Sequence, residues 1–388
     1  MLLIDQPYVS DFLLDTLRQY RFPVIATPAA RAMVQDSALN WMDTETAVAR
    51  LQADPAHLLY SISENGLDWL ARHLPDSARA RQVQVLKDKV QFRELCRSLF
   101  PDFFFREVRI DELQSLAAAD LPFPFVIKPS IGFFSIGVHI VRNEDDWQEV
   151  KQALQPEQLQ SIFPASVLDT GTFIMEEFIE GEEYAVDYYY DGDGKVVVLN
   201  VLHHLFSSGT DTSDRVYTTS KQIITRHRAA LETFLTSVGE QLQARNFPAH
   251  AEVRIDAQGR IQPIEINPLR FGGWCTSGDL LGLALGLNAY DYFFHQKVPD
   301  WDALFRGKEE QLFSIIVLNN TSGIAEADIS GFAYAKLAAD LEHPVAIRPL
   351  DIQKYGIFGF AFTETSPQNR QELARMLTAD LREYIIRS

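Results

Sequence analysis

Three side chains that carry oxygen atoms, Glu252, Glu265 and Asn267, have the types and the spacing that a divalent cation needs. Apolar and polar residues alternate over 251–256, which is typical of a half-buried strand, and a Gln-Gly turn leads to a second strand over 261–266. Residues two apart in a strand face the same way, so Glu265 and Asn267 share a face to which the hairpin can bring Glu252. Carboxylate and amide oxygens predict a Mg2+ site that substrate phosphates complete. The alternative is an exposed hairpin whose charges are solvated.

A second candidate site, for phosphate, begins at Lys128, which follows a strand expected over 125–127. The next residues form a loop whose backbone N–H groups can cradle phosphate oxygens while the lysine adds a positive charge. The glycines and serines of this loop are Ser130, Gly132, Ser135 and Gly137. It is not a P-loop, because Gly-Lys-Ser/Thr is missing and the element after the loop is a strand. An ordinary Gly-Ser hairpin loop would look the same.

Other polar groups are open to a chemical or a structural interpretation. The pair His203-His204 ends a β-prone run over 195–202, where it could supply a ligand, a base or only structural contacts. Acidic residues gather over 176–183 between two expected strands, where solvation is the ordinary outcome. Residues 207–220 are polar and have the length and composition of a mobile flap.

The elements that must position these residues follow from hydrophobic periodicity. Over 1–85 short strands alternate with helices, which predicts a parallel sheet; no Gly-x-Gly-x-x-Gly follows the first strand, so a dinucleotide site is not supported. A helix is expected over 86–100, with Asp88 as a possible N-cap. Residues 300–388 resemble a small α+β appendage that ends in a helix over 369–387. Further helices are expected over 144–154 and 225–245.

Bulk composition narrows the class of protein. The 388 residues are 46% hydrophobic and 23% charged, as in ordinary globular proteins of two or three domains. A net charge of -18 argues against nucleic-acid and anionic-membrane partners, which require a basic surface. Two cysteines give no disulfide framework and no cysteine-rich zinc site, so we expect a reducing, cytoplasmic compartment. The sequence shows no signal-like start and no apolar run long enough to span a membrane.

The order of these parts resembles the ATP-grasp superfamily over roughly residues 85 to 290, in particular its carboxylate–amine ligases, which include D-alanine–D-alanine ligases and L-amino acid ligases. Glu252 and Glu265 lie 13 residues apart, and Glu176 and Glu183 lie 7 apart, as in those ligases. The resemblance implies an ATP-grasp fold, α/β and α+β, with a Rossmann-like α/β domain before it and a small α+β subdomain after it. The implied segments are 1–85, 86–190 with the phosphate loop and adenine hinge, 191–299 with the metal site, and 300–388 as a lid or interface.

The same resemblance implies which residues hold ATP and metal. Lys89 and Lys128 would bind the α- and β-phosphates, and the loop that contains Ser130, Gly132, Ser135 and Gly137 would cover them. Glu183 would take the ribose hydroxyls. The adenine hinge would consist of Glu176, Glu177, Phe178 and Ile179. Glu252, Glu265 and Asn267 would hold two Mg2+ ions, with Mn2+ as a substitute.

The implied reaction makes an acyl phosphate from a carboxylate and ATP, which an amine attacks to give an amide, ADP and phosphate. Many relatives have Asn-Pro-Arg at this point, whereas here Leu269 intervenes before Arg270. Arg270 and Arg254 are therefore competing candidates for contact with the acyl phosphate. A thiol or another acceptor, and a non-catalytic ATP-binding module, are the alternatives.

The sequence does not name the substrates beyond a small carboxylate and an amine, and it leaves a homodimer open. Candidate substrate contacts come from the expected flap and from the segment after the metal site. They are His203, His204, Arg215, Gly272, Gly273 and Cys275. We do not expect Cys275 to act as a nucleophile, since an acyl group that ATP has activated does not require one.

Overall fold

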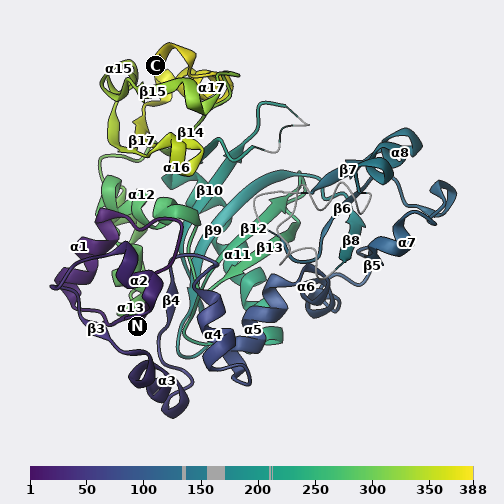
Figure 1. Cartoon of the computed structure of the whole chain (residues 1–388), viewed down its shortest axis with the longest axis horizontal. Coiled ribbons are helices and arrows are strands. Elements are labelled where there is room, and N and C mark those ends of the chain that lie inside the picture. Colours follow the sequence, from purple (N-terminus) through teal and green to yellow (C-terminus); the bar gives the residue numbers. More distant parts are fainter. Residues whose placement is uncertain (133–136, 155–170, 209–210, 212, 388) are drawn as a thin grey trace.

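The computed structural model describes residues 1–132, 137–154, 171–208, 211 and 213–387. Three main sheets follow one another across the molecule. Figure 1 shows the N-terminal part and the C-terminal part at one end, the large sheet in the middle, and the small sheet that follows residue 105 at the other end. Within the described residues no helix is long and apolar enough to cross a bilayer.

The N-terminal part is a parallel sheet with helices between its strands, as predicted. Its strand order is β3-β2-β1-β4, and every pair is parallel. Ser10, Thr27 and Asp43 cap the first three helices with their side-chain oxygens. The elements are β1 (Leu2–Leu3), α1 (Asp11–Tyr20), β2 (Val24–Ile25), α2 (Pro28–Met33), β3 (Trp41–Met42), α3 (Thr44–Ala53), β4 (Tyr60–Ser61) and α4 (Leu67–His73).

The helix expected over 86–100 is wrong in its bounds, because two helices, α5 (Ala78–Lys87) and α6 (Lys89–Cys96), meet there. Asp88 breaks the helical path with φ -90 and ψ 109. Its carboxylate accepts hydrogen bonds from the backbone N–H groups of Val90 and Gln91, so the predicted cap is confirmed. The break places Lys89 at the first position of α6, facing the large sheet.

A small antiparallel sheet of order β5-β8-β6-β7 carries the loop that is predicted to bind phosphate. Trp147 from the helix that covers it is fully buried against Phe125, with ring centroids 5.7 Å apart. The elements are β5 (Phe105–Arg109), α7 (Ile110–Leu113), β6 (Phe125–Pro129), β7 (His139–Val141), α8 (Glu144–Ala153) and β8 (Thr172–Glu177). The predicted strand-loop-strand around Lys128 is therefore confirmed.

The large sheet has the order β13-β12-β9-β10-β11-β14-β17-β16, and all of its pairs are antiparallel. Helix α11 covers one face so closely that a Cβ at Gly239 would lie 2.2 Å from the ring of Tyr190. The elements are β9 (Glu182–Tyr190), β10 (Val196–Leu205), β11 (Val216–Thr219), α11 (Lys221–Leu242), β12 (Phe247–Ile255), β13 (Ile261–Pro268), β14 (Leu312–Asn319), β16 (Pro344–Pro349) and β17 (Ile357–Thr365).

The C-terminal residues continue this sheet rather than building one of their own, since β14, β17 and β16 extend it beyond β11. The sheet crosses the boundary expected at residue 300, and the four-segment division stays a prediction. The expected flap contains strand β11.

The predicted terminal helix over 369–387 is wrong: the helix ends early, Leu381 has φ 59, and the chain returns as a strand. The remaining elements are α12 (Thr276–Leu285), α13 (Ala289–Phe294), α14 (Trp301–Leu304), β15 (Ile329–Phe332), α15 (Tyr334–Asp340), α16 (Ile352–Tyr355), α17 (Gln371–Thr378) and β18 (Ile385–Arg387).

Candidate active site

The register of β12 and β13 brings the three predicted metal ligands together. Glu252 lies directly opposite Glu265, next to a bulge in the ladder. Asn267 lies two residues further on the same face, and its Nδ2 donates to Glu265 Oε1 over 3.2 Å. The amide oxygen of Asn267 is thus the atom left for a cation, and the predicted hairpin geometry is confirmed.

The surroundings shift the pKa values of the two carboxyl groups in opposite directions. Burial and the neighbouring Glu265 raise the pKa of Glu252 well above its usual range. Burial alone would also raise the pKa of Glu265, but Lys89 and Lys128 outweigh it and hold that pKa at about 2. A half-buried carboxyl group that resists ionisation beside another carboxylate fits a place where a divalent cation supplies the missing positive charge.

The ligand set is one of two carboxylates and an amide. Among the described residues no group of three or more His, Cys, Asp or Glu side chains forms a ready-made metal site. Mg2+ differs from zinc or calcium in this respect, because it is commonly held by one or two carboxylates and completes its shell with water and substrate phosphates. The residues present fit that ion.

Lys89 joins the predicted metal ligands to the loop that is predicted to bind phosphate. Its Nζ lies 3.1 Å from Glu265 Oε2 and 3.4 Å from the backbone oxygen of Gly132. Its backbone N–H donates to the carbonyl of Ser130 over 2.8 Å. Gly137, at the end of the loop, has φ 74, a left-handed conformation that glycine adopts without strain. Ser135 lies outside the described residues.

Lys128 belongs to a buried cluster of charges that the sequence did not reveal. Glu176 binds Lys128 Nζ over 2.6 Å with one oxygen and Arg93 Nε over 2.7 Å with the other. All three side chains are almost fully buried. Arg93 and Lys128 overcome the effect of burial and hold the pKa of Glu176 at about 2. Glu176 therefore faces the phosphate lysine with both of its oxygens occupied.

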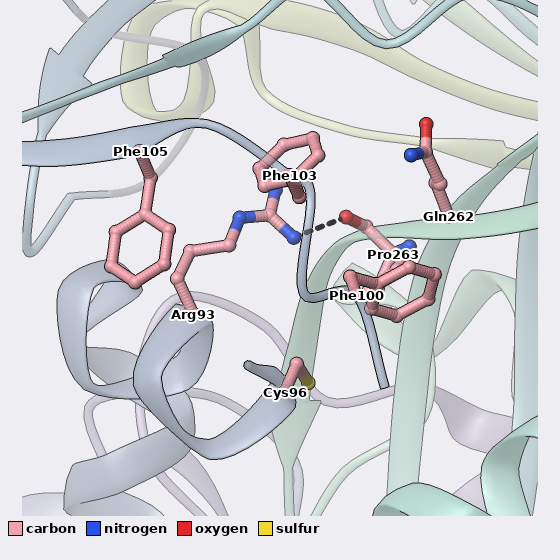
Figure 2. Close-up of a pocket in the computed structure, with 7 residues that line it drawn as sticks. All are labelled: Arg93, Cys96, Phe100, Phe103, Phe105, Gln262 and Pro263. Atoms are coloured by element: carbon pink, nitrogen blue, oxygen red, sulfur yellow. Dashed lines mark hydrogen bonds between the residues drawn. The ribbon is translucent and has the colours of Figure 1, made fainter. Parts of the chain in front are cut away.

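Arg93 also ties helix α6 to the large sheet, because its Nη1 donates to the carbonyl of Pro263 over 2.7 Å. Figure 2 shows this bond in a small pocket that aromatic side chains and Cys96 line. The pocket holds about 10 Å³, roughly the space of one water molecule. It is too small for a nucleotide base, so it is a packing feature behind the hinge.

The hinge and ribose residues lie side by side where β8 passes into β9. The backbone N–H of Glu177 donates to the carbonyl of Phe104 over 3.0 Å, and the backbone N–H of Phe104 donates to Glu177 Oε2 over 3.0 Å. Glu183 accepts from Arg254 at 3.2 Å and lies 2.9 Å from His204 Nδ1. Arg254 additionally donates to the carbonyl of Ile179 over 2.8 Å. The guanidinium of Arg254 is thus engaged at the hinge side of the site and lies over the ring of Phe178.

Comparison with known proteins agrees with this geometry. A model of the ATP-grasp domain matches residues 121–278. Residues 121–278 therefore form an ATP-grasp domain. The sequence of the chain is 28% identical over 163 residues to a D-alanine–D-alanine ligase of Anaplasma centrale, a match that spans 38% of this chain and 74% of the relative.

Solved structures share the ATP-grasp fold along the whole chain. An L-amino acid ligase from Bacillus licheniformis has a TM-score of 0.68 at 17% identity, covering 100% of this chain and 98% of that one. The biotin carboxylase of Campylobacter jejuni has 0.64 at 11%, covering 100% and 92%. The N5-carboxyaminoimidazole ribonucleotide synthetase of Thermotoga maritima has 0.63 at 15%, covering 99% and 98%. At these identities the matches show the fold alone.

In this ATP-grasp domain the additional residue before Arg270, Leu269, is accommodated by a local change in backbone conformation. Leu269 has φ 58, and its side chain is fully buried. Arg270 Nη2 then lies 3.2 Å from Glu64, a residue of the N-terminal part that also binds Lys87 over 3.1 Å. The Nε of Arg270 is buried and has no partner among the described residues. Arg270 lies beside the metal ligands, whereas Arg254 lies toward the hinge.

The structure separates the candidate substrate residues. His204 shares the face of Glu183 and stacks on Tyr217, with ring centroids 4.1 Å apart. His203 lies on the opposite face, where it stacks on Tyr184 at 4.9 Å. Arg215 is buried in the C-terminal part, and its guanidinium donates to three backbone carbonyls. They belong to Asn319, Met376 and Ala379.

The residues that follow Arg270 are tightly enclosed. A Cβ at Gly272 would lie 2.2 Å from Ser277 Oγ, so only glycine fits there, whereas Gly273 has no atom within 4 Å of such a Cβ. Cys275 is buried, and burial raises the pKa of its thiol to about 11. The thiol therefore stays protonated near neutral pH, in line with the expectation that it is no nucleophile.

Several residues of the candidate site were not predicted from the sequence. Asp187 accepts from His250 Nδ1 at 2.7 Å and from the backbone N–H of Gly272 at 3.0 Å. His250 stands two residues before Glu252 on the same strand face, which was a usable signal. Glu64 and Arg93 carried no local signal, because their partners lie 206 and 83 residues away.

Proposed function

We propose that this protein is an ATP-dependent carboxylate–amine ligase that forms an amide or peptide bond through an acyl phosphate and releases ADP and phosphate. The observation that carries the proposal is the position of Lys89, which contacts both the metal-ligand carboxylate Glu265 and the phosphate loop at Gly132. This arrangement suits a triphosphate whose charge must be neutralised from two sides. The names of two similar proteins, a D-alanine–D-alanine ligase and an L-amino acid ligase, favour amino acids among the substrates.

The residues of the chain would act mainly by binding and neutralising charge. Lys89 and Lys128 would exchange their carboxylate partners for the α- and β-phosphates, while Glu183 would accept from the ribose hydroxyls. Glu252, Glu265 and Asn267 would hold Mg2+, which supplies charge neutralisation and polarises the transferred phosphoryl group when it is bound. Arg270, whose Nε has no partner among the described residues, would stabilise the negative charge of the acyl phosphate. ATP as a substrate and two free cysteines favour the cytoplasm.

Release of phosphate from ATP tests this proposal. The protein and Mg2+ are given pools of amino acids and small carboxylic acids, singly and in pairs, with Glu265→Gln as the blank. We expect ADP and phosphate when a matching acid and amine are both present, and no release from the variant. AMP as a product, or release that the variant retains, would contradict a ligase of this type. Tight ATP binding with no release from any pool would instead favour a non-catalytic module.

A further inference from the structure

The segment from Leu269 to Cys275, here called the arginine loop, has an unusual backbone. Three of its residues that are not glycine lie in the left-handed region: Leu269, Trp274 and Cys275 each have φ 58. Side chains with a Cβ rarely adopt this conformation, and it persists only where surrounding contacts determine it. The arginine loop carries Arg270, so whatever holds the loop also sets the position of that guanidinium.

The N-terminal part and the large sheet hold the first half of the arginine loop. The carbonyl of Leu269 accepts from the backbone N–H of Ser61 over 2.7 Å. The backbone N–H of Phe271 donates to Tyr60 Oη over 3.2 Å, and that of Gly272 donates to Asp187 over 3.0 Å. These bonds hold Leu269, Phe271 and Gly272 on either side of Arg270, and they end before Trp274.

In the second half, Thr276 Oγ1 donates to the carbonyl of Gly273 over 2.8 Å, and an arginine of the C-terminal part holds Trp274. Arg348, on the edge strand β16, donates from Nη1 to the carbonyl of Trp274 over 2.9 Å. Its Nη2 lies 2.5 Å from Asp279, which is fully buried and also accepts from Tyr290 over 2.8 Å. The guanidinium is packed under aromatic rings, with centroids 5.3 Å away at Tyr8 and 4.9 Å away at Phe362. Arg348 is thus fixed before it reaches the loop.

We propose that Arg348 is a positioning residue: by holding the carbonyl of Trp274 it sets the arginine loop and thereby the place of Arg270 beside the metal ligands. The inference rests on the proposed ligase function for its kinetic consequence, but not for its structural one. It gives residues 300–388 a part in the active site, since β16 supplies the contact. A displacement of about 1 Å at a reacting group can lower a rate by about a hundredfold, so a remote arginine can control turnover.

Lysine at position 348 tests the two bonds of the Arg348 guanidinium, to Asp279 and to the carbonyl of Trp274, separately. Arg348→Lys keeps a positive charge for Asp279, but a single ammonium group cannot also serve the carbonyl of Trp274 with the fork geometry of arginine. The matched control is Arg382→Lys, since Arg382 also donates to a backbone carbonyl, that of Ser322, over 2.6 Å within the same C-terminal part. A second variant, Arg348→Met with Asp279→Leu, removes both charges together and avoids an unpaired buried charge.

Hydrogen exchange, nucleotide binding and kinetics are measured on the full-length chain. We expect Arg348→Lys and the double variant to speed exchange at the amides of Phe271 and Gly272 by about tenfold or more, with other core amides unchanged. In the same variants kcat falls about tenfold or more, while the KM for ATP and calorimetric MgADP binding stay within about twofold. Arg382→Lys should change none of these quantities.

Wild-type exchange at Phe271 and Gly272 in both Arg348 variants would overturn the proposal, as would a uniform rise across the core, which marks a purely structural role. Exchange that rises in the loop with kcat unchanged would also overturn it. If the wild-type protein shows no ligase activity on any substrate, the proposed function fails, while local exchange and MgADP binding still decide whether Arg348 sets the loop.

Discussion

At the scale of single residues, the site is a set of cations that each have a carboxylate partner. Lys89 binds Glu265, Lys128 shares Glu176 with Arg93, and Arg270 binds Glu64. These pairs keep buried charges from being unpaired, which would cost several kcal/mol each. Under the proposed function, a nucleotide and its metal would have to displace these carboxylates from the cations that bind them.

Glu176→Gln is expected to destabilise the fold strongly, because Lys128 and Arg93 both lose the carboxylate that they share. Breaking a buried pair from one side costs about 3–5 kcal/mol in the free energy of unfolding, which urea denaturation measures. The control is Glu94→Gln, which breaks an exposed pair with Arg97 and should cost less than about 1 kcal/mol. Equal losses in the two variants would contradict the buried network.

The loss in Glu176→Gln should depend on pH. The pKa of Glu176 is lowered from 4.5 to about 2 in the folded chain, so the ionised group stabilises the fold above pH 4.5. This stabilisation disappears as the pH falls from 4.5 toward 2, where the carboxyl group becomes protonated in both states. The difference from wild type should therefore be full at neutral pH and should narrow below pH 4.5. A constant difference across that window would argue against an ionised Glu176.

The two candidate arginines should differ in kinetics. Arg270→Gln is expected to lower kcat by about a hundredfold, because it removes a charge that acts on the transferred phosphoryl group, with little change in the KM for ATP. Arg254→Gln should instead raise the KM for ATP, since Arg254 holds Glu183 and the hinge carbonyl of Ile179. Steady-state kinetics at varied ATP measure both constants. The opposite pattern would exchange the roles of the two arginines.

At the scale of elements, the site depends on how strands and loops are placed against each other. The hairpin of β12 and β13 aligns Glu252 with Glu265, and the break at Asp88 sets Lys89 at the start of α6. The arginine loop then connects β13 to α12, and a Cβ at Gly272 would lie only 2.2 Å from Ser277 Oγ. A small change in this loop should therefore act on the site.

Gly272→Ala is expected to destabilise the fold by about 1–3 kcal/mol and to lower kcat, because the new Cβ would lie 2.2 Å from Ser277 Oγ and push the arginine loop away. The matched control is Gly273→Ala, whose Cβ meets no atom within 4 Å and which should leave both quantities near wild type. Thermal unfolding and phosphate release give the two readouts. Gly272→Ala with Ser277→Ala should recover part of the loss, and no recovery would speak against this contact as the cause.

At the scale of the whole molecule, one continuous sheet joins the site to the C-terminal residues. Strand β11 pairs with β14, and the buried Arg215 donates to carbonyls of Asn319, Met376 and Ala379. The last ninety residues therefore complete the sheet that carries the metal ligands, and they supply Arg348 to the arginine loop.

A chain cut after residue 299 should not fold on its own. It would expose the edge of β11 and the apolar side chain of Val216, and Arg215 would lose the carbonyls that it binds; we expect this to cost several kcal/mol against a total stability of about 5–15 kcal/mol. Circular dichroism and solubility of the fragment measure this, and coexpression of residues 300–388 is the control that should restore folding. A fragment that unfolds cooperatively by itself would support the predicted boundary at residue 300.

The sequence by itself determined the local parts of this protein and their order along the chain. Period-two alternation predicted the hairpin with Glu252 and Glu265, and residue types predicted the cap at Asp88 and the loop after Lys128. These features depend on neighbours a few residues away, and the resemblance to ATP-grasp proteins then placed them in one fold. The helix over 369–387 was wrong because its periodicity does not show that the chain turns back at Leu381.

Only the tertiary structure decided which charges meet and what the last ninety residues do. Arg93 and Glu176 are 83 residues apart, Glu64 and Arg270 are 206 apart, and Arg348 reaches Trp274 across 74. Each of these charged residues looks like an ordinary solvated charge in the sequence. A buried polar contact forms only where two distant parts of the chain approach each other and water is excluded around them. Sheet order and burial set both conditions, and neither has a local sequence signal.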